Sequence, residues 1–161
     1  MKKRKNTSIP PVAVKKEKTK GNQLDSWKFI VLAGIVLLTI ALYSNSLRNE
    51  ILTFDDNDYF QNYPEILNLS WESVTKYFSD YYVIMYQPLP VLTFAINYYF
   101  TETDTFPLHI VNLVLHLVNV VLVFYFIREL IANSIIAVSV SLLFAIHPMN
   151  VEAVSWISAR S

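Results

Sequence analysis

Long apolar runs determine what this chain can fold into, because such runs are stable only in a membrane or in a large core. The first run extends from Trp27 to Leu47, with Lys28 as its one charged residue and Gly34 as its one glycine. A helix of about 20 apolar residues crosses a hydrocarbon core of about 30 Å. We therefore expect a transmembrane helix over residues 27–47.

A cleaved signal peptide is the competing interpretation of this first run. The basic leader before it is 26 residues long, which is too long for the n-region of a signal peptide. Bulky Leu47 and Arg48 also stand where small residues should mark a cleavage site. We therefore favour an uncleaved signal anchor.

Two further apolar runs follow. The run from His109 to Ile131 is long enough to span, whereas the run from Ser134 to Ile146 reaches spanning length only with flanking residues at both ends. We expect a second transmembrane helix at 109–131 and a third at 132–148. The predicted fold class is all-α, a polytopic membrane protein with about three spans.

Composition agrees with this fold class. Charged residues make up 16% of the chain, whereas about 25% is typical of soluble domains. Two glycines are too few for a glycine-rich phosphate loop, and the absence of cysteine excludes disulfides and thiolate zinc sites. We expect membrane lipids, and no nucleic acid, as partners.

The net charge of zero is a cancellation between two segments of opposite charge. Residues 1–28 contain nine Lys and Arg and two acids, a net charge of +7, and residues 29–161 contain four Lys and Arg and eleven acids, a net charge of −7. Because basic segments stay on the cytoplasmic side, we expect a cytoplasmic N-terminus. His109, His147 and the acidic residues after the first helix then lie at the opposite, extracytoplasmic face.

This topology predicts six segments. They are a disordered basic tail (1–26), a first helix (27–47), an acidic extracytoplasmic loop (48–108), a second helix (109–131), a third helix (132–148) and the start of an extracytoplasmic interfacial helix (149–161). Within the loop, residues 69–82 predict an amphipathic helix capped by Ser70, and residues 88–100 predict a juxtamembrane or re-entrant helix that is too short to span. The chain stops inside a predicted helix at Ser161, so we expect a longer protein.

An acidic cluster follows the first helix. Asp55, Asp56 and Asp58 fall within four positions. Neighbouring carboxylates repel, so one of them is expected to have a raised pKa and to be available as a base, unless a cation neutralises them. The alternative is an acidic turn that caps the next segment.

A polar stripe runs along the second predicted helix. His109, Asn112, His116 and Asn119 are spaced by 3, 4 and 3 residues, which places them within an arc of about 80°. Polar side chains in membrane helices line a cavity or face a bundle interior, and they also hydrogen-bond neighbouring helices. Both roles stay open. No metal site is predicted, because His109 and His116 are two turns apart.

The C-terminal segment contains a predicted break and a basic residue. Pro148 ends or kinks the third helix, and Asn150 is predicted to cap a new one that carries Glu152 and Arg160. The guanidinium of Arg160 suits a phosphate; the alternative is an interfacial anchor.

Several motifs resemble one known family. They occur in the order Phe54-Asp55-Asp56-x-x-Tyr59-x-x-Asn62, Tyr86-x-Pro88-Leu89, His109-x-x-Asn112-x-x-x-His116 and Phe144-Ala145-x-His147-Pro148-x-x-x-Glu152-Ala153-Val154, with Ser158-x-Arg160. The set resembles the N-terminal membrane part of the transmembrane and tetratricopeptide-repeat-containing O-mannosyltransferases, which are polytopic glycosyltransferases of the C-type fold. The resemblance covers roughly residues 27–161, and Gln87 departs from it where relatives often carry arginine.

The resemblance implies a function and a site. The implied donor is a sugar, mannose in this family, on a polyprenyl phosphate, and the implied acceptor is a protein hydroxyl or a lipid. Asp55 is implied as the base, or as a ligand of a divalent metal, with Asp56 as the second choice. Our candidates for the donor phosphate are Arg160, His147 and His109.

Asn112, His116 and Glu152 are the residues that we expect to line this site. We expect the membrane to be that of the endoplasmic reticulum or the plasma membrane of a bacterium or archaeon. The alternative function is a non-catalytic membrane subunit or transporter segment, in which the stripe only packs helices. We expect the 161-residue chain alone to be inactive, because three spans cannot enclose a lipid-linked donor.

Overall fold

The computed structural model describes residues 26–49, 62–82, 84–101 and 104–160, which form helices and connecting loops with no β-strand among them. The elements are α1 (Ser26–Tyr43), the 3-10 helix η1 (Ser44–Arg48), the 3-10 helix η2 (Pro64–Leu67), α3 (Trp71–Tyr77), α4 (Pro88–Thr101), α5 (Thr105–Ile131), α6 (Ser134–Ala145), α7 (Asn150–Ser155) and the 3-10 helix η3 (Ser158–Arg160). The predicted tail and the acidic cluster lie outside the described residues.

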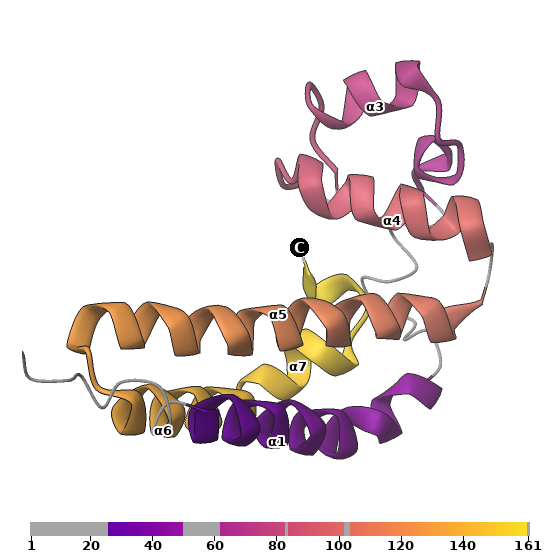
Figure 1. Ribbon diagram of the computed structural model, residues 1–161. Helices are drawn as coiled ribbons and strands as arrows, with labels where there is room; N and C mark the ends of the chain where they lie inside the picture. Colours follow the sequence, from indigo (N-terminus) through magenta and orange to yellow (C-terminus); the bar gives the residue numbers. More distant parts are fainter. Residues whose placement is uncertain (1–25, 50–61, 83, 102–103, 161) are drawn as a thin grey trace, which may run out of the picture.

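Three helices lie side by side in a bundle, with α1 and α6 running in one direction and α5 in the other (Figure 1). Their buried contacts agree with this antiparallel arrangement. Later residues of α1 contact earlier residues of α5. The three contact sets are Leu32 with Phe124 and Ala137, Ile35 with Val120 and Ala145, and Tyr43 with Leu113 and Val154.

Small residues let α6 approach α5 closely. Ala137, Ser141 and Ala145 are spaced by four residues and are fully buried. The hydroxyl of Ser141 donates to the Val120 carbonyl at 2.9 Å. Small side chains with a polar contact are typical of helix packing in membranes. The contact between α5 and α6 therefore has the composition of a helix–helix contact inside a membrane.

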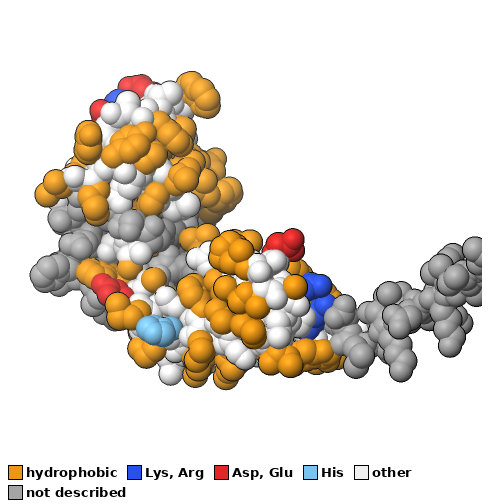
Figure 2. Space-filling view, turned by 90° about the vertical axis from the view of Figure 1, so that its left-hand side faces the viewer, with side chains coloured by type: hydrophobic (Ala, Val, Ile, Leu, Met, Phe, Trp, Pro, Cys, Tyr) orange, Lys and Arg blue, Asp and Glu red, His pale blue; other side chains and the backbone are white. Residues whose placement is uncertain are grey.

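Two helical segments are long and apolar enough to cross a membrane. They are Ser26–Arg48 and Thr105–Ile131, with mean hydropathies of 2.1 and 2.4, and each is only 28% buried inside the structure. Apolar side chains accordingly cover much of the face in Figure 2. An unpartnered apolar surface of this size is typical of contact with lipid or with further protein.

The predicted third span is shorter than expected. Helix α6 has 12 residues, so it extends about 18 Å where about 30 Å of hydrocarbon must be crossed. The structure thus contains two helices of spanning length and one shorter apolar helix in the part that it describes.

Residues 62–82 and 84–101 form a unit of η2, α3 and α4 that packs beside α5 (Figure 1). We call this the loop unit. Its core consists of Ile66, Tyr77, Tyr82, Val91, Phe94 and Ala95, together with Leu108 of α5 and Ile157 near the C-terminus. The last two contacts attach the loop unit to the bundle, so its position is set by α5 and by the segment after α7.

Local sequence explains where the loop helices begin and end. The Ser70 hydroxyl accepts from the Ser73 amide at 3.1 Å, as expected of an N-cap. Helix α3 ends at Tyr77, short of the predicted end at Tyr82. The Ser79 hydroxyl donates to the Thr75 carbonyl at 2.9 Å, and such side-chain bonds compete with the helical ones.

Helix α5 begins four residues before the predicted His109. Asp104 is its N-cap, and its carboxylate accepts from the Phe106 amide at 3.1 Å. Pro107 then falls in the first turn, where a missing N–H costs nothing. The apolar run alone concealed this polar start, so the predicted boundary at 109 was wrong.

Replacement of Phe94 by alanine should unfold the loop unit selectively. Phe94 is fully buried in the core of this unit, and truncation of a buried phenylalanine costs about 3–5 kcal/mol. We expect hydrogen exchange to accelerate in α3 and α4 but not in α6, with the protein held in lipid nanodiscs. Leu89→Ala is the matched control because Leu89 is 63% exposed; equal exchange in both variants would contradict the described core.

The loop unit should also lose stability at alkaline pH. Burial, and secondly the nearby Glu65 carboxylate, raises the pKa of Tyr82 to about 12, whereas an unfolded tyrosine titrates near 10. The stabilisation is therefore complete below about pH 10 and is lost as the pH rises through about 12. Amide protection measured from pH 9 to 12 should fall less steeply in Tyr82→Phe than in the wild type. Identical profiles would show that ionisation of Tyr82 does not cause the loss of stability.

Candidate functional site

The third helix breaks at Pro148, and this break organises the surrounding residues. A helix that continued would donate the amide of residue 148 to the Phe144 carbonyl, but proline has no N–H. The Phe144 carbonyl accepts instead from the His147 amide at 3.3 Å and from Nδ2 of Asn150 at 2.7 Å. The prediction that Asn150 caps α7 was wrong: Met149 precedes α7, and Asn150 bonds back to the end of α6.

The next carbonyl of α6 is also paired by a side chain. The Met149 amide, which would serve the Ala145 carbonyl in a continuous helix, donates instead to Nδ1 of His147 at 3.2 Å. Nε2 of His116 lies 3.2 Å from the Ala145 carbonyl and donates to it. One residue of the polar stripe thus completes the hydrogen bonding at the break.

Two other residues of the polar stripe donate hydrogen bonds to carbonyls just beyond the ends of other helices. Asn112 is 2% exposed and donates Nδ2 to the Trp156 carbonyl just beyond α7 at 2.8 Å. His109 is 1% exposed, and its Nε2 donates to the Asn49 carbonyl just beyond η1 at 3.1 Å. The stripe therefore connects α5 to the ends of η1, α6 and α7.

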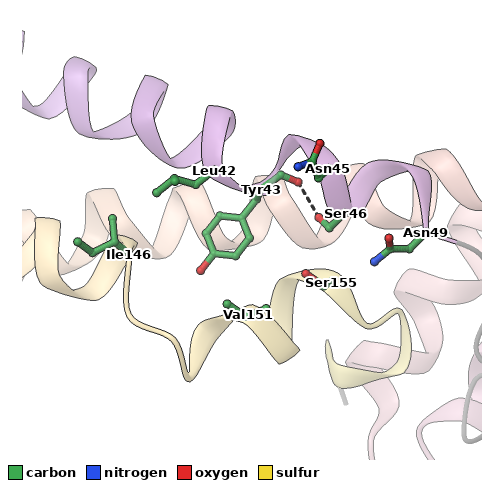
Figure 3. Close-up of a pocket in the computed structure, with 8 residues that line it drawn as sticks. All are labelled: Leu42, Tyr43, Asn45, Ser46, Asn49, Ile146, Val151 and Ser155. Atoms are coloured by element: carbon green, nitrogen blue, oxygen red, sulfur yellow. Dashed lines mark hydrogen bonds between the residues drawn. The ribbon is translucent and has the colours of Figure 1, made fainter.

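A first cavity, of about 410 Å³, lies between the end of α1 and α7 (Figure 3). We call it the α1–α7 cavity. Apolar side chains such as Leu42, Ile146 and Val151 line one part, and the polar side chains of Asn45 and Asn49 line another. Tyr43 also lines it, with its ring directed toward α7 in Figure 3.

A second cavity, of about 310 Å³, lies on the other side of α7, against α5. We call it the α5–α7 cavity. Its lining includes Asn112, His116 and Asn119 of α5, Phe144 of α6, and Asn150 and Ala153 of α7. The rings of His116 and Phe144 stack with their centroids 5.5 Å apart. The helix break creates this space, because α6 ends where α5 continues.

The structure brings some predicted site residues together and separates others. Asn112 and His116 share the α5–α7 cavity, while the buried His109 contacts backbone. His147 and Glu152 are exposed. Asp55 and Asp56 lie outside the described residues, as does the side chain of Arg160. Among the described residues, no group of three His, Asp or Glu is arranged to hold a metal ion.

Several lining residues were not predicted from sequence. Asn45, Ser46 and Asn49 line the α1–α7 cavity from the polar end of the first helical segment, and Ser155 lines it from α7. The only sequence signal for them is the change from apolar to polar residues after Tyr43. That signal marks a membrane boundary equally well, so it does not identify a cavity.

Comparison with known proteins identifies relatives for about half of the chain. Protein O-mannosyl-transferase TMTC1 of Homo sapiens is 42% identical over 77 residues, which is 47% of this chain and 9% of the relative. Protein O-mannosyl-transferase TMTC3 of Homo sapiens is 38% identical over 76 residues, again 47% of this chain and 8% of the relative. This chain is similar to protein O-mannosyl-transferases.

A longer alignment relates the chain to protein O-mannosyl-transferase tmtc2 of Xenopus laevis, with 29% identity over 134 residues, which is 77% of this chain and 16% of the relative. The similarity confirms the resemblance that the motifs predict. The matched segments span less than a fifth of these O-mannosyl-transferases. No known family model and no solved structure matches the chain.

Replacement of Asn112 by leucine should loosen α7. The Trp156 carbonyl then loses its side-chain donor, and an unsatisfied buried group costs about 1–3 kcal/mol. Because the chain has no cysteine, Val154→Cys gives a single thiol at a fully buried position on α7. Maleimide labelling of this thiol should become about 5- to 150-fold faster when Asn112→Leu is added.

Asn119→Leu is the matched control for this experiment. Asn119 lies two turns further along the same stripe but is exposed, so its replacement should leave the labelling rate unchanged. If Asn112→Leu also leaves the rate unchanged, Asn112 does not hold α7 in place.

Proposed function

We propose that the intact protein is an integral membrane glycosyltransferase. It transfers mannose from a polyprenyl-phosphate carrier to a protein hydroxyl. The observation that carries this proposal is the similarity to several proteins named protein O-mannosyl-transferases, at 38–42% identity over about half of the chain. Mannose and the protein acceptor come from those names, and the lipid-phosphate donor comes from the motif resemblance.

The proposed location is a membrane with the reaction on its extracytoplasmic side, either the endoplasmic reticulum or a microbial plasma membrane. Two segments have spanning length and are only 28% buried, which favours contact with lipid. The +7 charge of residues 1–28 favours a cytoplasmic N-terminus. The end of α1 and the start of α5 then face the other compartment, together with residues 50–103 between them.

The proposed base is Asp55, with Asp56 as the second choice. Asp55 follows Asn49, a lining residue of the α1–α7 cavity, by six positions. The carboxylate takes the proton of the acceptor hydroxyl as the hydroxyl oxygen attacks the anomeric carbon. The bond between that carbon and the phosphate oxygen breaks, and the lipid phosphate leaves. A positioned base typically contributes about 10²–10⁴-fold in rate.

The leaving phosphate needs groups that stabilise its developing charge. We propose Arg160 and His147 for this role. His147 is exposed on the α6–α7 break, and its Nδ1 is occupied by the Met149 amide, so Nε2 is the nitrogen that can bind phosphate. His109 was predicted for the same role, but its burial against the Asn49 carbonyl favours a positioning role at the end of η1.

A non-catalytic membrane subunit is the second candidate function. It is supported by the hydrogen bonds that His109, Asn112 and His116 donate to carbonyls at or just beyond helix ends. These bonds account for the three residues without catalysis. It does not account for the exposed Asn119 or for the acidic cluster after η1.

The decisive test uses membranes that contain the intact protein and radiolabelled polyprenyl-phosphate mannose. Asp55→Ala should lower transfer to acceptor protein by about 10²-fold or more, with expression and membrane insertion unchanged. Asp58→Ala, in the same acidic cluster, is the matched control and should retain transfer. Transfer by Asp55→Ala at the wild-type rate would refute the base assignment, and no transfer by the wild type would favour the non-catalytic subunit.

A further inference from the structure

A side chain that lines the α5–α7 cavity carries a buried acceptor atom without a hydrogen-bond partner among the described residues. Asn112 is 2% exposed, and its Nδ2 is committed to the Trp156 carbonyl. Because a carbonyl can only accept, this bond fixes which end of the amide is nitrogen. Its Oδ1 is buried and has no partner among the described residues. Such an atom costs about 1–3 kcal/mol unless a ligand or water donates to it.

Other lining side chains have complementary chemistry. Asn150 also commits its Nδ2 to a carbonyl, that of Phe144, which leaves its Oδ1 as an acceptor. Asn119 lines the same cavity with an amide that both donates and accepts. None of the described lining residues is Asp, Glu, Lys or Arg. The cavity therefore suits an uncharged ligand that carries several hydroxyl groups.

Size restricts this ligand further. Ligand pockets usually have volumes of about 300–1,000 Å³, and the α5–α7 cavity, at about 310 Å³, is at the lower limit. One sugar ring is a suitable occupant, and an oligosaccharide is too large. Phe144 adds an apolar surface against which a sugar ring can lie.

We propose that the α5–α7 cavity is the subsite for the hexose of the lipid-linked donor, with the sugar hydroxyls donating to Oδ1 of Asn150 and bonding the amide of Asn119. This assignment rests on the proposed function. It gives the stripe two roles, since Nδ2 of Asn112 holds α7 while the amide of Asn119 receives the ligand.

Binding measurements on the intact protein in lipid nanodiscs test the assignment. The probes are polyprenyl-phosphate mannose and the same polyprenyl phosphate without sugar, and the readout is the ratio of their affinities. We expect the wild type to bind the mannose-bearing lipid at least about 10-fold more tightly. Asn119→Leu should reduce that ratio about 3- to 10-fold, and Ala153→Phe, which fills the cavity from α7, should reduce it to about one.

Val151→Phe is the matched control. Val151 is two positions away on α7, is 49% exposed and lines the α1–α7 cavity instead, so the ratio should stay at the wild-type value. Circular dichroism of each variant should match the wild type, and loss of the ratio in a folded Ala153→Phe protein supports the subsite. Free methyl α-mannoside should compete with the mannose-bearing lipid in the wild type.

Two results would overturn the assignment in distinguishable ways. If the wild type prefers the mannose-bearing lipid and Ala153→Phe keeps that preference, the hexose binds elsewhere and the proposed function survives. If the wild type binds neither lipid, the donor chemistry of the proposed function fails, and the subsite fails with it.

Discussion

The missing amide of Pro148 is the constraint on which the site depends. In an apolar environment a backbone carbonyl without a donor is costly, and at the break between α6 and α7 the Phe144 and Ala145 carbonyls lack the donors that a continuous helix would supply. The His147 amide and Asn150 donate to the first of these carbonyls, and His116 donates to the second. The polar residues of α5 are thus required by the chain break beside them, and the same break opens the space that they line.

Much of the helical framework could be predicted from the sequence, because apolar runs and their polar ends mark helices directly. The first helix and α4 begin and end close to their predicted bounds, whereas α6 is shorter than the predicted 132–148. The start of α5 was missed because the cap at Asp104 lies outside the apolar run. The end of α3 was missed because Ser79 bonds the preceding turn, a local competition that amphipathic periodicity does not reveal.

Prediction of the site went less far for a physical reason. Spacing placed Asn112 and His116 on one face of α5, and the structure has both at one cavity. Spacing could not say which atoms of these side chains are already bonded, since that depends on where α7 ends. Asn150 illustrates the difficulty: an asparagine after a proline favours an N-cap, yet its amide donates to the Phe144 carbonyl of the preceding helix.

Helix α7 is six residues long and has a cavity on each side. It therefore separates the two cavities, and any shift of α7 enlarges one cavity at the expense of the other. Because free-energy coupling between two sites is reciprocal, a ligand on the α5 side that changes binding on the α1 side by some factor has its own binding changed by the same factor. A single short helix between them is enough to make ligand binding in the two cavities interdependent.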